Sequence, residues 1–486
     1  MDRYKRAKLN TLCGLLKQII TIICGFILPR VYLVNYGSQV YGIVSSITQF
    51  LSFVTLMELG MGAVVQTALY KPLAEKNNIE ISKIIKSATQ FFNKVAIMFG
   101  IYTLILAIVY PMLIQNKFGF LFEASLVIII SISSLAEYFF GITYRLLLMS
   151  DQLAFITLGL QSVGLILNFV ICIVLMQMGA PIHLVKLASS IVLLLRPIGQ
   201  VIYVNKHYHI DKNITFEKEP INQKWNGVAQ HVAYYITNNT DTIVLSIFST
   251  LENVAIYAVY NMIASGIKEL VLTLNSGMGA LFGNLLANKE VDELIIQFRK
   301  FEWKIHAIVT LLFSCVGLLI VPFVTVYTQG ISDADYVQPM FAILITLAQA
   351  TYCIRLPYDT IVNAAGHYKQ TQLSSIIEMC LNLGITIILV SKYGLIGAAI
   401  GTFVALLYRT IYLAFYLSKR TIINYSFFIF WENIVIDIIE VMIIIGIVHI
   451  FDFYCENYID WFKSAIGIFL ISFSVVLIIN LMIHKD

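Results

Sequence analysis

Residues 464–483 read SAIGIFLISFSVVLIINLMI, a run of 20 residues without a charged side chain. A helix rises 1.5 Å per residue, so about 20 apolar residues cross roughly 30 Å of bilayer hydrocarbon. This stretch can therefore span a membrane as one helix. Similar segments recur along the chain and predict fourteen spans, at 11–34, 38–68, 88–113, 121–149, 152–178, 182–205, 226–249, 251–287, 303–329, 336–363, 367–391, 394–417, 431–450 and 461–483.

The overall composition is that of a membrane protein. Of the 486 residues, 59% are hydrophobic and 12% are charged, and the mean hydropathy is +0.83. A soluble domain carries about a quarter charged residues, so most of this chain does not face water. Backbone groups in lipid must be satisfied within each segment, and the ten-residue alternation of a membrane barrel is absent. The spans are therefore predicted to be helices, in an all-α integral membrane protein, and no cleavable signal peptide is evident.

The positive charges between the spans lie almost wholly on one side. With residue 1 inside, the inside segments carry 21 lysines and arginines, and the outside segments carry four. Cytoplasmic loops are enriched in Lys and Arg, so both termini are predicted to be cytoplasmic. The outside cations are Arg30, Lys117, Lys392 and Lys463.

No pattern of a metal, nucleotide or catalytic site is present. The seven cysteines show no CxxC spacing, the eight histidines form no HExxH pair, and GxxxxGK[ST] is absent. The cations are dispersed over short loops, so a nucleic-acid partner is not expected. We predict no metal, no cofactor and no catalytic residue, and we do not expect an enzyme.

The two halves of the chain resemble one another. Gly60-Met61-Gly62-Ala63 recurs as Gly277-Met278-Gly279-Ala280, at an offset of 217 residues. The same spacing, within a few residues, relates Asn168 to Asn382, Arg196 to Arg409, Tyr203 to Tyr416 and Lys206 to Lys419. Six spans per repeat give both halves one orientation, with a pseudo-two-fold axis along the membrane normal and a substrate path between the halves.

This repeat predicts four parts. They are an N-lobe of six spans at 1–205, a cytoplasmic linker at 206–225, a C-lobe of six spans at 226–418, and two additional C-terminal spans at 419–486.

Charged residues inside the spans are candidates for the transport path, because charge in the hydrocarbon is costly unless it is paired or lines a cavity. A wall of Lys and Arg suits a diphosphate, since Arg binds phosphate oxygens bidentately. The predicted substrate-binding cations are Lys17, Arg196, Lys268, Arg355 and Arg409. Arg145 lies near the end of its span, and the acidic set is Glu58, Glu137, Asp241, Glu269, Asp359, Glu378, Asp437 and Glu440.

Structural roles remain open for several of these residues. Arg355 and Asp359 are four residues apart and could neutralise one another on one helix. Arg196 and Arg409 could brace helix ends rather than form a cationic wall. Asp241 lies in the polar run TNNTDT at 237–242, which could serve hydrogen bonding between helices. The functional alternative is that Asp241 and Glu58 couple transport to a H⁺ or Na⁺ gradient.

Several motifs resemble the Wzx-type polysaccharide-biosynthesis flippases of bacteria. They are RAKLN at 6–10, VNYGSQVYG at 34–42, ELGMGA at 58–63, NTDTIVLS at 239–246, NAAGHYKQT at 363–371 and YGLIGAAIGT at 393–402. The resemblance covers about residues 1–420. It implies the fold of the multidrug/oligosaccharidyl-lipid/polysaccharide (MOP) exporter superfamily, with two six-helix lobes in a V and two extra C-terminal helices.

The resemblance also implies a function. Such flippases move undecaprenyl-diphosphate-linked oligosaccharides across the bacterial cytoplasmic (inner) membrane by alternating access, for assembly of O-antigen, capsule or exopolysaccharide. A polymerase and a chain-length regulator are expected partners. Lys17 and Asp241 match positions of the family. Two alternatives stay open: a multidrug exporter on the same fold, and a membrane enzyme acting on the same lipid carrier, which the short outside loops disfavour.

Overall fold

The structure is a computed structural model that describes residues 3–56, 58, 61–114, 118–211, 213–215, 228–275, 277–419, 422–423, 425–451 and 455–483. Every regular element in these ranges is a helix, as the sequence predicts. Gly60 of the repeated motif lies outside the described residues. So do several cations used to orient the chain, namely Lys117, Lys212, Lys218, Lys224, Arg420 and Lys485.

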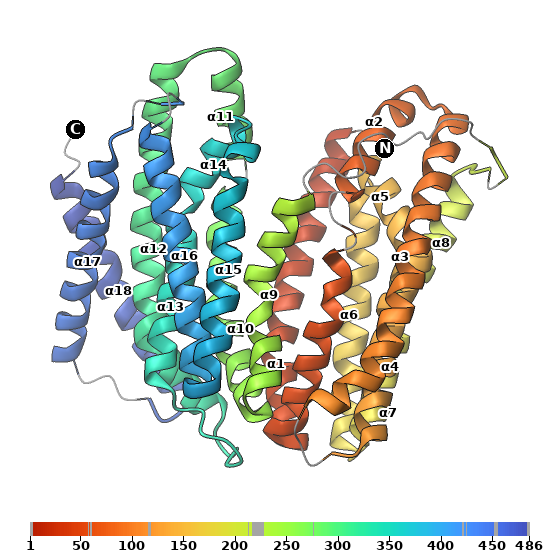
Figure 1. The fold of residues 1–486 in the computed structure, drawn as a ribbon, viewed down its shortest axis with the longest axis horizontal. Coiled ribbons are helices and arrows are strands. Elements are labelled where there is room, and N and C mark those ends of the chain that lie inside the picture. The colour runs from red at the N-terminus through yellow and green to blue at the C-terminus, as the bar shows by residue number, and fades with distance from the viewer. Residues whose placement is uncertain are drawn as a thin grey trace. The chain divides into compact units, whose positions relative to one another are not determined.

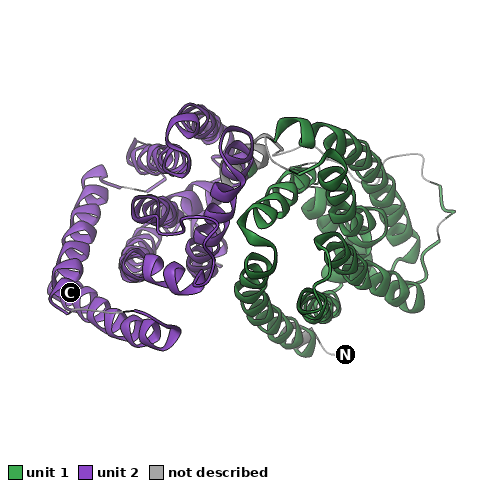
Figure 2. Ribbon diagram, turned by 90° about the horizontal axis from the view of Figure 1, so that it is seen from below, with its two compact units in different colours: residues 1–235 green, residues 236–486 purple. Residues whose placement is uncertain are grey.

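Two compact units divide the chain at 235/236, which falls inside α9 (Val228–Phe248) (Figure 2). The predicted linker at 206–225 lies largely outside the described residues. Unit 1 otherwise contains α1 (Arg3–Ser52), η1 (Phe53–Leu56), α2 (Met61–Glu75), α3 (Asn78–Leu113), α4 (Phe120–Ala136), η2 (Glu137–Gly141), α5 (Ile142–Ser150), α6 (Ala154–Gln177), α7 (Ile182–Leu193) and α8 (Leu195–His207) (Figure 1).

Unit 2 continues from α9 to the C-terminus. Its helices are α10 (Leu251–Asn275), α11 (Met278–Ala287), α12 (Val291–Tyr327), α13 (Pro339–Ile354), α14 (Leu356–Ala364), α15 (Tyr368–Tyr393), α16 (Leu395–Lys419), α17 (Phe427–Ile450) and α18 (Tyr458–Ile483). The last two pack on α12 and on each other.

The described helices account for the fourteen predicted spans. Twelve segments are long and apolar enough to cross a membrane, and Lys8–Leu56 has 49 residues, more than twice the length of one crossing. Two helices meet within it at Gly37, whose φ of 78° is readily adopted by glycine, so this segment holds two spans. The 21-residue helix α9 lies at the place of the predicted span 226–249; it is not among these twelve, and counted as a span it makes fourteen.

The repeated GMGA motif marks a helix start in both units. In unit 1, α1 and the short η1 that follows it end at Leu56, and α2 begins at Met61. In unit 2, α10 ends at Asn275 and α11 begins at Met278, after Gly277 with a left-handed φ of 95°. The predicted spans 38–68 and 251–287 are therefore each divided by a turn, as their excess length indicates.

Two helices are longer than predicted. The spans predicted at 88–113 and 303–329 belong to helices α3 and α12, which begin at Asn78 and Val291. Their first turns contain charged residues, so hydropathy detects only the part that lies in hydrocarbon. An asparagine cap helps to start α3, because the Asn77 side chain accepts from the Glu80 amide.

Candidate functional site

Unit 1 contains a polar cavity of about 380 Å³. Its walls come from the end of α1, η1, α4, η2, α5, α6, α7 and α8. Besides hydroxyl groups such as those of Ser133 and Ser134, four charged residues line it: Glu58, Glu137, Arg145 and Arg196. The sequence predicts all four to be at or near the membrane interior, yet only Glu58 and Arg196 are among the predicted site residues.

The four charges form one connected set centred on Glu137. Its carboxylate lies 2.5 Å from Arg196 Nη2, accepts from Arg196 Nε at 3.2 Å, and lies 3.4 Å from Arg145 Nη1. Arg145 Nη2 also lies 3.9 Å from Glu58. The two arginine side chains and Glu58 retain 24–29% exposure, so a ligand in the cavity can reach them.

The backbone around Glu137 is specialised for this contact. Residues Glu137–Gly141 form a π-helical turn, a feature that is rare and often found at functional sites. A Cβ on Gly141 would lie 2.5 Å from the Glu137 carboxylate and 2.9 Å from Pro197, the neighbour of Arg196. Glycine at 141 therefore lets α8 approach and places Arg196 against Glu137.

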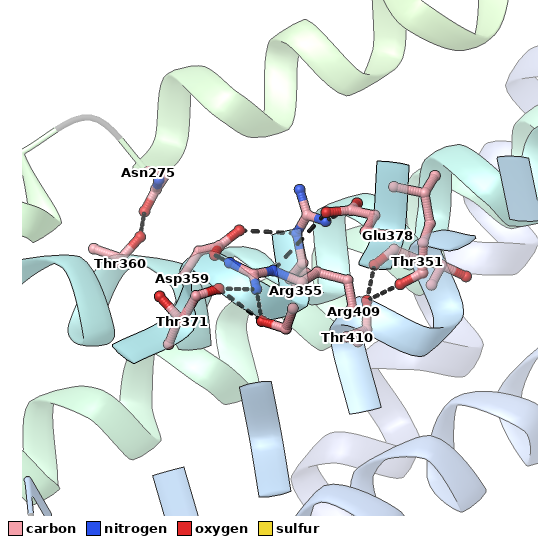
Figure 3. A network of polar contacts seen from close by, with 11 residues as sticks. Asn275, Thr351, Arg355, Asp359, Thr360, Thr371, Glu378, Arg409 and Thr410 are labelled. Atoms are coloured by element: carbon pink, nitrogen blue, oxygen red, sulfur yellow. Dashed lines mark hydrogen bonds and ion pairs between the residues drawn. The ribbon is translucent and has the colours of Figure 1, made fainter. Parts of the chain in front are cut away.

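Unit 2 contains a second cluster of two arginines and two carboxylates (Figure 3). Arg355 bridges Asp359 at 2.8 Å and Glu378 at 2.6 Å. Arg409 lies 4.0 Å from Asp359 and 3.9 Å from Glu378, and it donates to the Thr371 carbonyl at 2.9 Å. The Arg355–Asp359 pair that the sequence leaves open is thus formed.

Burial separates this cluster from that of unit 1. Arg355, Arg409 and Glu378 are 4%, 6% and 7% exposed. Charges removed from water are tolerated when each is paired and hydrogen-bonded, and two cations here meet two carboxylates. This arrangement joins α13, α14, α15 and α16, and it leaves the arginines little access to a ligand.

Lys268 lies close to the arginine cluster. It is 9% exposed on α10, and its Nζ lies 5.1 Å from the centre of the Tyr352 ring. The guanidinium of Arg355 lies 4.6 Å from the same ring. Tyr352 therefore stabilises two neighbouring cations through its π face.

A polar cluster of a different kind surrounds Asp241 (here called the oxygen cluster: Asp241, Tyr257, Asn382 and Thr402). The residue is 5% exposed on α9, and its Oδ2 accepts from Thr402 at 2.6 Å and from Tyr257 at 3.0 Å. Asn382 in turn donates to Thr402 at 2.9 Å. The buried oxygens without a hydrogen-bond partner among the described residues include Asp241 Oδ1, Asn382 Oδ1 and Thr386 Oγ1.

Oxygens of these three kinds, from a carboxylate, an amide carbonyl and a hydroxyl, are the ligands that a small hard cation prefers. The sequence identifies Asp241 but not its partners Tyr257 and Thr402. Asn382 is noted there only for its place in the repeat. Uncharged polar residues are common in spans, so nothing in their spacing signals that they gather around one carboxylate.

Lys17 belongs to none of these groups. It is half-buried in the first part of α1, and its side chain makes no ion pair with any residue that the structure describes. The seven predicted site residues thus fall into distinct places. Glu58 and Arg196 line the unit 1 cavity, Lys17 is on α1, and Asp241 is in the oxygen cluster. Lys268, Arg355 and Arg409 lie in or beside the buried arginine cluster.

Comparisons with known proteins identify the fold. No protein-family model matches the chain, and no curated protein matches it by sequence. Among solved structures, the lipid II flippase MurJ in its inward closed conformation superposes with a TM-score of 0.74, at 15% identity over 98% of this chain and 99% of that one.

Multidrug transporters share the same architecture. An inward-facing multidrug resistance MATE family transporter of the MOP superfamily gives a TM-score of 0.59, at 13% identity over 86% of this chain and 99% of that one. The eukaryotic MATE transporter AtDTX14 gives 0.54, at 13% identity over 85% and 96%. The chain is therefore a multi-pass membrane protein with the fold of the MOP exporters.

Proposed function

We propose that the protein is a flippase that moves undecaprenyl-diphosphate-linked oligosaccharide from the cytoplasmic leaflet to the outer leaflet for surface polysaccharide assembly. The observation that carries the proposal is the unit 1 cavity, where Arg145 and Arg196 remain partly exposed. Guanidinium groups bind phosphate oxygens in a fork geometry. The fold shared with a lipid II flippase supports the same conclusion.

The carboxylates of the cavity can be replaced at the two arginines by phosphate oxygens of the substrate. Glu137 holds both arginines, and Glu58 holds Arg145 more loosely. Phosphate oxygens that enter the cavity compete with these carboxylates for the same guanidinium groups. Lys17, on the same unit, is proposed as an additional phosphate contact.

Coupling to an ion gradient is assigned to the oxygen cluster around Asp241 in unit 2. Asp241, Asn382 and Thr386 each present a buried oxygen without a hydrogen-bond partner among the described residues. Na⁺ can take carboxylate, amide and hydroxyl oxygens as ligands together, whereas a proton would bind only the carboxylate. We therefore propose Na⁺ as the coupling ion. The buried Arg355 and Arg409 are proposed to hold unit 2 together rather than to touch substrate.

Antiport of a cationic drug is the second candidate, because MATE transporters share the fold and Glu58 and Asp241 supply acidic groups. The flippase and the drug antiporter differ in the charge of their substrate. A diphosphate requires Arg145 and Arg196, whereas a cation requires the carboxylates and is repelled by the arginines.

The test follows the lipid-linked oligosaccharide in a strain that lacks the gene. We expect complete units to accumulate on the cytoplasmic leaflet and to be released when the gene is restored. Arg196→Gln should reduce this release at least tenfold while the protein still reaches the membrane. Lys83→Gln, on α3 of the same unit, is the matched control and should act like the unaltered protein.

Two results would contradict the proposal. Normal leaflet distribution in the deletion strain, together with increased susceptibility to cationic drugs, would establish the multidrug alternative. Units that reach the outer leaflet but remain unpolymerised would indicate an enzyme that acts after translocation.

A further inference from the structure

Helix α12 extends well beyond the hydrocarbon on one side of the membrane. Its 37 residues correspond to about 55 Å at 1.5 Å per residue, against roughly 30 Å of hydrocarbon. The charged residues lie at its beginning, up to Lys304, whereas 305–327 is almost wholly apolar. The first turns of α12 are therefore at the level of the lipid headgroups, on the side that the charge distribution predicts to be cytoplasmic.

The two C-terminal helices meet α12 at this level. Helix α17 begins at Phe427, where Ser426 caps it, and α18 ends at Ile483. A cleft of about 970 Å³ lies between the three helices, and Phe428, Trp431 and Ile483 contribute to its walls together with residues 299–304 of α12.

Three cations line this cleft: Arg299, Lys300 and Lys304. All three are exposed, and none forms an ion pair with a residue that the structure describes. Two carboxylates also line the cleft. That of Glu302 is 1% exposed and accepts from Tyr425 at 2.7 Å and from Tyr358, whereas Glu432 is exposed. The accessible charge of the cleft is therefore positive.

Aromatic side chains form the apolar part of the same cleft. Trp303 and Trp431 belong to the type of residue that gathers where hydrocarbon meets headgroups. Trp303 is fixed in place because its Nε1 donates to Asn480 on α18, and Asn480 donates to Glu440 on α17 at 2.8 Å. One turn further along α12, His306 Nδ1 lies 2.6 Å from Asp437 Oδ2, and this contact joins α12 to α17.

We propose that this cleft binds an anionic glycerophospholipid of the cytoplasmic leaflet. The phosphate lies among Arg299, Lys300 and Lys304, and the acyl chains run along Trp303, Trp431 and the apolar face of α17. The unpaired cations match the phosphate of such a lipid, and the aromatic wall matches its acyl chains. Basic pockets between helices on the cytoplasmic side are suited to anionic headgroups. A free phosphate would leave the aromatic wall without a partner. The site is separate from the cavity of unit 1 and does not depend on which cargo the protein carries.

The test compares lipids on the purified full-length protein by native mass spectrometry. Phosphatidylglycerol is titrated against phosphatidylcholine with identical acyl chains. We expect the protein to bind phosphatidylglycerol preferentially, and the triple variant Arg299→Gln, Lys300→Gln, Lys304→Gln to bind it at least tenfold more weakly. The control variant Lys71→Gln, Lys76→Gln, Lys83→Gln removes three cations from α2, the following turn and α3, and should bind as the unaltered protein does.

A second measurement locates the acyl chains. Phosphatidylglycerol with brominated chains should quench the tryptophan fluorescence of the protein, and Trp303→Phe, Trp431→Phe should remove most of that quenching. Equal weakening in both triple variants would show diffuse electrostatic attraction and overturn the proposal. Unchanged binding in the Arg299 set, or displacement of the lipid by millimolar inorganic phosphate, would overturn it as well.

Discussion

The arginines at repeated positions act differently in the two units. Arg196 and Arg409 occupy corresponding places, but Arg196 bonds to Glu137 at the edge of a cavity, whereas Arg409 is buried against Thr371, Glu378 and Asp359. The carboxylates come from different helices in the two units. A repeated cation therefore does not imply a repeated function, because its environment depends on which acids lie beside it.

The Arg355–Glu378 pair is expected to be strongly coupled. Removing one partner leaves a buried charge without compensation, which costs about 3–5 kcal/mol. We expect Arg355→Met and Glu378→Met each to lower the thermal unfolding temperature of the purified protein. The double variant should lower it by much less than the sum of the two single decreases. Strictly additive losses would contradict this pairing.

Asp241 is expected to determine sodium binding. A ligand that binds only the folded state raises its stability, so NaCl should raise the unfolding temperature more than choline chloride at equal ionic strength. Asp241→Asn should abolish that difference, whereas Asp335→Asn, in the segment between α12 and α13, should retain it. If the unaltered protein shows no difference between the salts, the sodium assignment is wrong.

At the scale of helices, the contact of α15 with α16 depends on two glycines. Gly397 and Gly401 form a GxxxG pattern, which allows close approach of helices in membranes. A Cβ at 397 would lie 2.4 Å from the Leu389 backbone, and one at 401 would lie 2.9 Å from the Thr386 amide nitrogen. Neither backbone can move aside without displacing the helix.

Gly401→Ala should therefore separate α15 from α16 and destabilise the protein by about 1–3 kcal/mol, the usual cost of overpacking. It should also weaken the sodium effect, because Thr386 lies against Gly401. Gly384→Ala is the matched control on α15, since its Cβ would meet nothing within 4 Å. Unfolding temperatures of the two variants give the comparison, and equal values would count against this packing.

For the whole molecule, the distribution of charge predicts the orientation in the membrane. In a variant without the seven native cysteines, a cysteine at Lys463 should react with a membrane-impermeant maleimide on intact cells, because Lys463 lies at the beginning of the last span, on the predicted outer side. A cysteine at Lys289, between α11 and α12, should react only after the cells are opened. The reverse pattern would invert the topology.

Much of the fold could be predicted from the sequence, because helices in lipid must satisfy their own backbone and hydropathy reports that requirement directly. The fourteen spans, the turns within the two longest and the additional C-terminal helices follow from it. The charged starts of α3 and α12 could not be found this way, since a helix that leaves the hydrocarbon has no hydropathy signal.

The site was predictable only in part. The predicted spans place Glu58, Glu137, Arg145 and Arg196 at or near the membrane interior. Charge there is costly, so these residues are candidates for a functional site. The sequence cannot show that Glu137 is the centre of that set, nor that Thr402 lies beside Asp241. Those pairings join residues that are 59 and 161 positions apart, brought together by helix packing.

The sequence by itself thus determined the class of molecule, its number of spans and its expected orientation, because each of these depends on the transfer of one segment from water to lipid. Only the tertiary structure decided which charges neutralise one another and which remain accessible. That distinction depends on distances of a few ångströms between different helices. It separates the accessible arginines of the unit 1 cavity from the buried arginines of unit 2.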